Sequence, residues 1–225
     1  MFQLDVIAVS LVGYLLGSIP FAVIFAKRRG VDVFAVGSGN PGATNVMREV
    51  GKGVGRIVFG LDFLKGLVAT WWFQVEFLVT TPDDPEFLGL CGMIAAVIGH
   101  GFPVFSGFRG GKGVATTMGA LLGVMPAAMA VGLLVWLSLF LSLRYVSLAS
   151  IGFGVSLPVT VWIGELLSEG EGRYVKVAFS AALAVWILVR HHSNVSRLLA
   201  GEEDKQVGLS KKTQPQDSSS VIRPQ

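Results

Sequence analysis

The stretch from residue 114 to residue 143, VATTMGALLGVMPAAMAVGLLVWLSLFLSL, decides the fold of this chain. It contains no charged side chain, and an α-helix of about 20 apolar residues is already long enough to cross the hydrocarbon core of a bilayer. The stretch is therefore too long for one ordinary crossing. Pro126 lies near its centre, where the missing N–H and the clash of the proline ring break or kink a helix. We predict two short crossings that meet at Pro126.

The other apolar runs have the same character. They cover residues 4–26, 57–79, 87–105, 145–164 and 174–190. Of the 225 residues, 52% are apolar and only 15% are charged, against about 25% charged residues in soluble domains. The single cysteine excludes an internal disulfide framework and a cysteine-rich metal site. This composition predicts an all-α, polytopic integral membrane helix bundle.

Charged residues between the apolar runs indicate how the chain crosses the membrane. Residues 27–56 carry six basic and two acidic side chains, so the positive-inside rule places them in the cytoplasm and the N-terminus outside. The tail after Arg190 is also basic and is predicted to be inside. Two acidic connections are consistent with the outer face: Asp83, Asp84 and Glu86, and Glu165, Glu169 and Glu171. Topology thus accounts for the net charge of +3, and we expect no nucleic-acid partner.

The parity of the crossings gives their expected number. An outer N-terminus and an inner C-terminus require an odd number, and a break at Pro126 raises the six apolar runs to seven crossings. Five crossings with re-entrant segments are the alternative. We expect one transmembrane domain over residues 1–203 and a polar, disordered cytoplasmic tail over residues 204–225.

The first motif in the predicted cytoplasmic part is GSGNPGATNVMR, residues 37–48. Its glycines let backbone N–H groups turn toward an anion, and Arg48 can hold a phosphate through two N–H groups. An ordinary turn needs only one or two such residues. The hydroxyl and amide side chains of this motif are candidates for fixed hydrogen bonds to a substrate: Ser38, Asn40, Thr44 and Asn45.

The second motif, GLDFLKG at residues 60–66, places Asp62 and Lys65 three residues apart in an apolar run. Each charge alone would be costly inside a bilayer, so we expect the two side chains to pair. We assign both a structural role in holding the site.

The third motif, HGFPVFSGFRGGKG at residues 100–113, is a glycine-rich loop that opens the next predicted helix. The orphan N–H groups and the dipole at such a helix start favour an anion. The loop is not a Walker A motif, because Ser106 stands where that motif needs glycine and Lys112 is followed by Gly113. Nucleotide hydrolysis thus loses its main support.

The fourth motif, RHHSNVSRLLAGEE, covers residues 190–203. His191 and Asn194 are separated by three positions, so a helix would present both to one ligand, while His192 would point elsewhere. Adjacent histidines diverge on a helix, and the chain has no HExxH sequence, so we predict no metal site.

Together the four motifs resemble the bacterial membrane acyltransferases of PlsY type, which use acyl phosphate to acylate glycerol 3-phosphate. GSGNPGATNVMR, DFLKG, GHGFPVFSGFRGGKGVAT and RHHSNVSRLLAGEE stand in the family's order, and the resemblance covers residues 4–203. It implies essential roles for Ser38 and Arg48, action of His191 and Asn194 at the site, and a structural role for Glu203. It also implies a phosphate-binding loop for glycerol 3-phosphate: Gly110, Gly111, Lys112 and Gly113.

The resemblance further implies a multi-pass inner-membrane enzyme with a cytoplasmic active site that catalyses the first acylation of phospholipid synthesis. Acyl phosphate would be the donor, no cofactor would be needed, and a functional link to the enzyme that makes acyl phosphate is expected. The general base stays open between His191 and a substrate phosphate oxygen. The alternative function is a transporter or channel for a small anionic phosphorylated metabolite, since broken helices with basic groups also form anion sites.

Overall fold

The computed structural model describes residues 2–74, 84–167 and 173–205, and every regular element in these ranges is a helix. The elements are α1 (Phe2–Gly17), α2 (Phe21–Lys27), α3 (Ala43–Glu49), α4 (Lys52–Trp71), η1 (Trp72–Gln74), α5 (Pro85–Gly101), η2 (Val104–Ser106), α6 (Val114–Val124), α7 (Pro126–Leu143), α8 (Val146–Leu167), α9 (Arg173–Arg190) and α10 (His192–Ala200). The predicted all-α class is confirmed.

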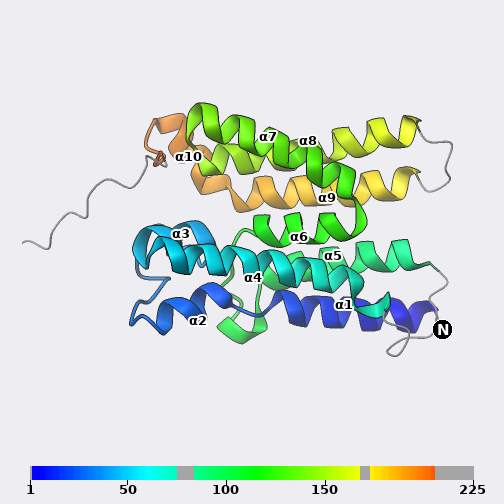
Figure 1. Ribbon diagram of the computed structural model, residues 1–225, viewed down its shortest axis with the longest axis horizontal. Helices are drawn as coiled ribbons and strands as arrows, with labels where there is room; N and C mark the ends of the chain where they lie inside the picture. Colours follow the sequence, from blue (N-terminus) through cyan, green and yellow to red (C-terminus); the bar gives the residue numbers. More distant parts are fainter. Residues whose placement is uncertain (1, 75–83, 168–172, 206–225) are drawn as a thin grey trace, which may run out of the picture.

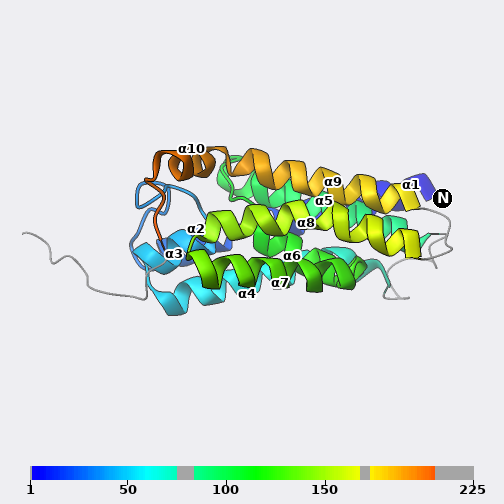
Figure 2. The same cartoon turned by 90° about the horizontal axis from the view of Figure 1, so that it is seen from above.

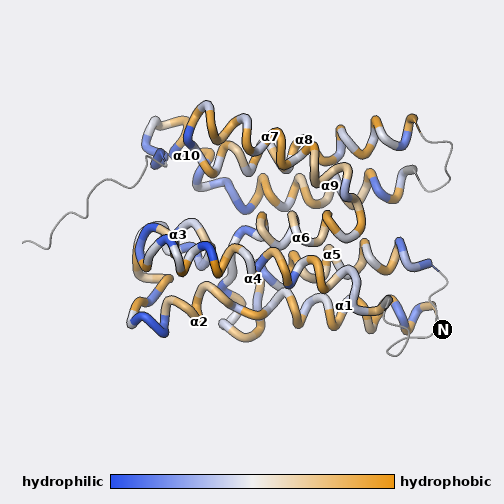
Figure 3. The backbone as a smooth tube through the Cα atoms, viewed as in Figure 1, coloured by the Kyte–Doolittle hydropathy of each residue, from blue (hydrophilic) through white to orange (hydrophobic). Residues whose placement is uncertain are grey.

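The long helices lie side by side along one axis of an elongated bundle (Figures 1 and 2). The N-terminus lies at one end of the bundle, and the short helices α2, α3 and α10 gather at the other. Helix α1 packs against α5, α4 against α6, and α8 against both α7 and α9. Figure 3 shows apolar stretches along the middle of the bundle and strongly hydrophilic ones around α2, α3 and α10. The motif-rich segments therefore share one polar end.

The run that decides the fold breaks where it was predicted to break. Helix α6 ends at Val124, Met125 adopts a non-helical conformation, and α7 begins with Pro126 at its first position. The first residue of a helix has no intrahelical acceptor for its N–H, so proline costs nothing there.

The surface of the bundle is apolar where a bilayer would contact it. Leu4, Ile7, Leu134 and Leu141 are each at least 60% exposed, although leucine and isoleucine are usually buried in soluble proteins. Inside the bundle, α4 and α6 approach closely, because a Cβ at Gly119 would collide with the backbone of α4. Small residues at helix contacts are typical of membrane proteins.

The number of crossings stays a prediction. Within the described ranges, four segments are long and apolar enough to span a bilayer, and the pair α9 and α10, bent by 56°, forms a fifth candidate. Helix α4 has 20 residues but carries charges, and α6 has only 11 residues, about 16 Å of helix. Seven crossings, as predicted, require that both α4 and α6 cross the membrane. Asp83, Glu169, Glu171 and residues 206–225, most of the predicted tail, lie outside the described residues.

Candidate active site

A cleft of about 590 Å³ opens near the polar end of the bundle. One part of it is polar and basic, and carries predicted site residues from α3, the loop before α6, and α10. The other part is apolar and lies among α4, α6, α7 and α8. The polar lining includes Ser38, Asn40, Thr44, Asn45, Arg48, Lys112, His191, Asn194 and Glu203, and the apolar lining includes Phe59, Met118, Leu133, Trp136, Phe140 and Val146. All four motifs thus contribute to one cavity, the second through Asp62.

Two of the predicted substrate-binding residues do not line this cleft. Gly110 and Gly111 instead border a smaller cavity of about 10 Å³, and the N–H of Gly111 donates to the carbonyl oxygen of His100 at 3.1 Å. That N–H is therefore not available to an anion. The structure gives the two glycines a supporting position behind the cleft, whereas Lys112 and Gly113 reach it.

Asn45 holds the first motif from inside. Its side chain is buried; Nδ2 donates to the carbonyl oxygens of Val33 at 3.2 Å and Val36 at 3.1 Å, and Oδ1 accepts the N–H of Ser38 at 3.1 Å. Both amide hydrogens are consumed within the loop. The structure therefore favours a positioning role for Asn45 over the direct substrate contact expected from the sequence, with Ser38 exposed at the cleft as the group that it fixes.

Lys112 starts a chain of polar contacts across the cleft. Its Nζ donates to Oδ1 of Asn194, and Nδ2 of Asn194 donates to Glu203 at 2.6 Å. Glu203 also accepts from Nε of Arg197 at 2.8 Å, while Glu202 is exposed. The chain orients the lysine from the far side of the cleft. Asn194 is thus a bridge, and Glu203 rather than its neighbour is the glutamate that supports it.

Electrostatics make Lys112 sensitive to pH. Burial lowers the pKa of Lys112 to about 8; Glu203 opposes the shift, and Arg197, Arg190 and Arg48 add to it. Burial raises the pKa of Glu203, but Ser147, Asn194 and Arg197 outweigh this, so its net pKa is lowered. The cleft therefore holds an ionised carboxylate beside a lysine that loses its proton in the mildly alkaline range.

His191 has a defined tautomer. It is buried at the junction of α9 and α10, and its Nδ1 lies 2.8 Å from the carbonyl oxygen of Ile187. A carbonyl oxygen only accepts, so Nδ1 carries the proton and Nε2 of the neutral ring has a free lone pair. Burial and the nearby Lys112 lower the pKa of His191 to about 4. The ring is neutral at physiological pH.

Arg48, the predicted phosphate ligand on α3, lines the cleft and pairs with Asp204. Its Nη1 lies 3.1 Å from the Asp204 carboxylate, and Nη2 lies 3.4 Å from the Asp204 carbonyl oxygen. The two side chains are 30% and 79% exposed. The segment after α10 therefore reaches α3 across the mouth of the cleft. The guanidinium of Arg48 is paired with the carboxylate of Asp204.

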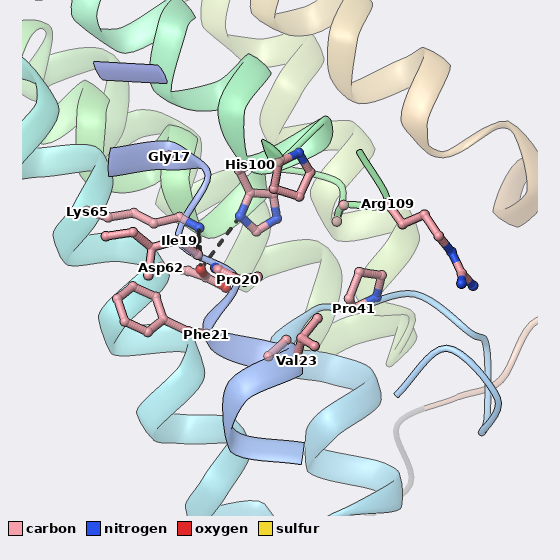
Figure 4. A pocket seen from close by; sticks show the side chains of 14 residues that line it. Gly17, Ile19, Pro20, Phe21, Val23, Pro41, Asp62, Lys65, His100 and Arg109 are labelled. Atoms are coloured by element: carbon pink, nitrogen blue, oxygen red, sulfur yellow. Dashed lines mark hydrogen bonds and ion pairs between the residues drawn. The ribbon is translucent and has the colours of Figure 1, made fainter. Parts of the chain in front are cut away.

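Asp62 and Lys65 form the ion pair that their spacing predicts. Nζ of Lys65 lies 2.8 Å from the Asp62 carboxylate and also donates to the carbonyl oxygen of Ile19 at 2.9 Å. Nδ1 of His100 lies 3.6 Å from the same carboxylate and 3.2 Å from Oγ1 of Thr116. Figure 4 shows Lys65 and His100 pointing to Asp62 from either side. This buried cluster joins α4, α5 and α6 to Ile19, in the connection between α1 and α2.

Sequence reasoning missed several residues of the site. Arg190 and Trp186 on α9 bond the backbone of the glycine loop, and Arg197 lines the cleft. Asp204 and His100 also border it. Arg190 and Arg197 belong to the fourth motif, and their place in this motif is the sequence signal that could identify them. Nothing in the sequence marks contacts to backbone carbonyl oxygens, and Asp204 follows the last motif directly.

Comparisons with known proteins identify the family. A glycerol-3-phosphate acyltransferase family model matches residues 7–201. The glycerol-3-phosphate acyltransferase of Aquifex aeolicus is 46% identical over 85% of this chain and 94% of its own, and that of Halalkalibacterium halodurans is 41% identical over 89% and 94%. The crystal structure of PlsY (YgiH), an integral membrane glycerol 3-phosphate acyltransferase, in its glycerol 3-phosphate form is 40% identical with a TM-score of 0.75, covering 89% of this chain and 94% of that one. Its lysophosphatidic acid form gives a TM-score of 0.74 over the same shares.

These findings confirm the family resemblance, the class of enzyme and the multi-pass membrane fold that the sequence predicts. The family model spans the first three motifs and residues 190–201 of the fourth. The chain belongs to the glycerol-3-phosphate acyltransferase family.

Proposed function

We propose that the protein transfers a fatty acyl group from acyl phosphate to glycerol 3-phosphate, giving 1-acyl-glycerol 3-phosphate and inorganic phosphate. The observation that carries this proposal is the shape of the cleft, in which a basic, polar part continues into an apolar part. The polar part suits phosphate groups, and the apolar part suits an acyl chain. Names of the relatives and the two ligand forms of the similar crystal structure support the acceptor and the product.

The acceptor phosphate is proposed to bind at Lys112 and the start of α6. Lys112 and Gly113 line the cleft, together with Val114 and Ala115 of the first helical turn. Backbone N–H groups at a helix start and a lysine ammonium both attract a phosphate. Arg48, on the opposite side, is proposed to hold the donor phosphate after releasing Asp204.

The reaction is proposed to proceed by direct attack. The acceptor hydroxyl oxygen bonds to the acyl carbonyl carbon, the bond from that carbon to the phosphate oxygen breaks, and phosphate leaves. The leaving group is already activated, so positioning and electrostatic stabilisation can provide most of the acceleration. Ser38 is proposed to donate a hydrogen bond at the reacting end.

His191 is proposed to orient the acceptor hydroxyl through Nε2. With a pKa of about 4, its ring is a weak final acceptor for the hydroxyl proton. A phosphate oxygen, with a second pKa of about 6, holds that proton more strongly. We therefore propose that the proton leaves with the phosphate, while the histidine accepts the hydroxyl hydrogen bond during the attack.

The acyl chain is proposed to lie along Trp136, Phe140 and Leu133 of α7. The indole of Trp136 stacks on Phe140 with ring centroids 4.9 Å apart, and its Nε1 donates to Ser150 on α8 at 3.3 Å. The polar atom of this tryptophan is thereby satisfied, and its apolar face is left for a chain.

We infer that the site faces the cytoplasm from the inner membrane. The basic connection over residues 27–56 and the segment after Arg190 belong to the end that carries the cleft (Figure 1). Acyl phosphate is a reactive donor, so a functional link to the enzyme that produces it belongs to the proposal.

The deciding experiment incubates purified protein in lipid with acyl phosphate and glycerol 3-phosphate, and measures phosphate release and the mass of the lipid product. We expect both to depend on both substrates and to need no added metal or nucleotide. A long-chain acyl-CoA replaces acyl phosphate in the control. Phosphate release without an acceptor, or product formed only from the thioester, would contradict the proposal.

A further inference from the structure

The end of α9 is bonded to three consecutive carbonyl groups of the glycine loop. Nη2 of Arg190 donates to the carbonyl oxygens of Gly110 at 2.8 Å and Gly111 at 2.7 Å, and Nε of Arg190 also donates to Gly111 at 3.2 Å. Nε1 of Trp186 donates to the carbonyl oxygen of Lys112 at 3.1 Å. A fourth carbonyl, that of Gly101 at the end of α5, lies 3.4 Å from Nη2 of Arg190.

These two side chains also support each other. The guanidinium of Arg190 lies over the ring of Trp186 at 5.8 Å and over that of Phe102 at 5.4 Å. The Trp186 ring packs edge to face with Phe102. The planar guanidinium is therefore held in one place while its fork of donors faces the loop. A lysine at this position could not reproduce the fork.

The direction of these carbonyls fixes the direction of the neighbouring N–H groups. In a planar trans peptide the C=O and the following N–H point to opposite sides. With the Gly111 and Lys112 carbonyls turned to α9, the N–H groups of Lys112 and Gly113 point away from α9. Neither N–H has a protein acceptor in the described part of the chain, and both residues line the cleft. Gly113 adopts a positive φ of 86°, which favours glycine there.

We propose that Arg190 and Trp186 are positioning residues for the acceptor: by holding the loop carbonyls they aim the N–H groups of Lys112 and Gly113 at the phosphate of glycerol 3-phosphate. The proposal rests on the proposed function of the cleft. His191 directly follows Arg190, so one helix end sets both the phosphate loop and the imidazole that orients the hydroxyl. Arg190 acts through the loop and does not touch the substrate.

The test compares two variants of the full-length protein in lipid. Trp186→Phe keeps the ring and removes one N–H, so its KM for glycerol 3-phosphate should rise about 2- to 10-fold. Arg190→Gln removes charged donors, so that KM should rise about 10- to 100-fold. The KM for acyl phosphate should stay unchanged in both. His192→Gln, an exposed neighbour outside the cleft, is the matched control.

The pH profile separates positioning from a general loss of structure. Arg190 is one of the like charges that disfavour the charged form of Lys112, whereas Trp186 carries no charge. Arg190→Gln should therefore move the alkaline rise of the KM for glycerol 3-phosphate to higher pH, and Trp186→Phe should leave its midpoint in place. A loss of fold would produce neither pattern.

The outcomes are distinguishable. If the wild-type protein does not acylate glycerol 3-phosphate, the proposed function fails. If it does, but Trp186→Phe and Arg190→Gln leave the KM for glycerol 3-phosphate unchanged or raise both KM values equally, the positioning proposal fails while the function stands. Should Arg190→Gln not fold, Trp186→Phe alone decides by the same criterion.

Discussion

The titration of Lys112 gives the sharpest prediction. Its pKa is lowered to about 8 in the substrate-free protein, and a bound phosphate interacts more favourably with the ammonium than with the neutral amine. The charged form exists below the pKa, so binding of glycerol 3-phosphate should weaken as the pH rises through 8. For a site that requires the charge, KM should rise about 10-fold between pH 7 and pH 9.

The rise of the KM for glycerol 3-phosphate should level off at high pH, where the contacts that do not depend on the charge of Lys112 still bind the substrate. A charge-assisted hydrogen bond contributes about 1.5–3 kcal/mol, so the plateau should lie about 10- to 100-fold above the value at neutral pH. Below about pH 6 the substrate phosphate itself gains a proton and binding weakens again. The lowest KM is therefore expected between pH 6 and pH 8.

The assay is the initial rate of phosphate release at saturating acyl phosphate, with glycerol 3-phosphate varied at each pH. Lys112→Met should raise KM about 10- to 100-fold at pH 7 and remove the alkaline rise. Lys112→Arg stays charged across this range and should also remove the rise. If the KM of Lys112→Met still rose with pH as steeply as that of the wild-type protein, another group would be titrating and the assignment to Lys112 would be refuted.

Further predictions concern the rest of the cleft. His191→Ala should lower kcat by about 10²- to 10⁴-fold with a smaller change in KM, and a change in KM alone would count against its role at the reacting hydroxyl. Gly111→Ala places a Cβ against the buried His100 and should raise the KM for glycerol 3-phosphate by about 10- to 100-fold. A change confined to kcat would contradict the placement of the acceptor phosphate at this loop. Asp204→Asn frees Arg48 from an exposed ion pair of at most about 1 kcal/mol, so the KM for acyl phosphate should fall at most about fivefold, and a rise would exclude competition at the guanidinium. A cysteine at position 40, in a background without the native cysteine, should resist an impermeant external reagent in intact cells; labelling would overturn the topology.

The features that the sequence predicts well depend on local chemistry. A proline inside a long apolar run is tolerated mainly in the first turn of a helix, and Pro126 stands at the first position of α7. Opposite charges at positions 62 and 65 must pair inside an apolar bundle, and they do. The gathering of the motifs at one polar end follows from charge and hydropathy, which act along the chain and need no tertiary information.

The features that the sequence does not reveal depend on backbone groups. Every residue has a carbonyl oxygen, so no sequence pattern marks those of Gly110 and Gly111 as acceptors for Arg190. Both glycines lie against His100 behind the cleft, where a Cβ would collide with it. Their part in phosphate binding stays a prediction. Asn45 shows a related limit of sequence patterns, because an amide that binds a substrate and one that binds a loop look identical in sequence. Its predicted contact with the substrate stays a prediction.

Under the proposed function, helix α9 explains how so small a bundle holds two phosphorylated substrates in register. Trp186 and Arg190 fix the loop before α6, and the helix then bends by 56° at His191, so that α10 turns Asn194 toward Lys112. A straight helix would carry the residues after Arg190 onward along the bundle axis and away from the loop. The bend therefore brings the fourth motif back over the third, and it couples the proposed site of the acceptor phosphate to His191, the group proposed to orient the hydroxyl. Because direct transfer requires reacting atoms within about 3–3.5 Å, this rigid coupling is what the proposed mechanism needs from the protein.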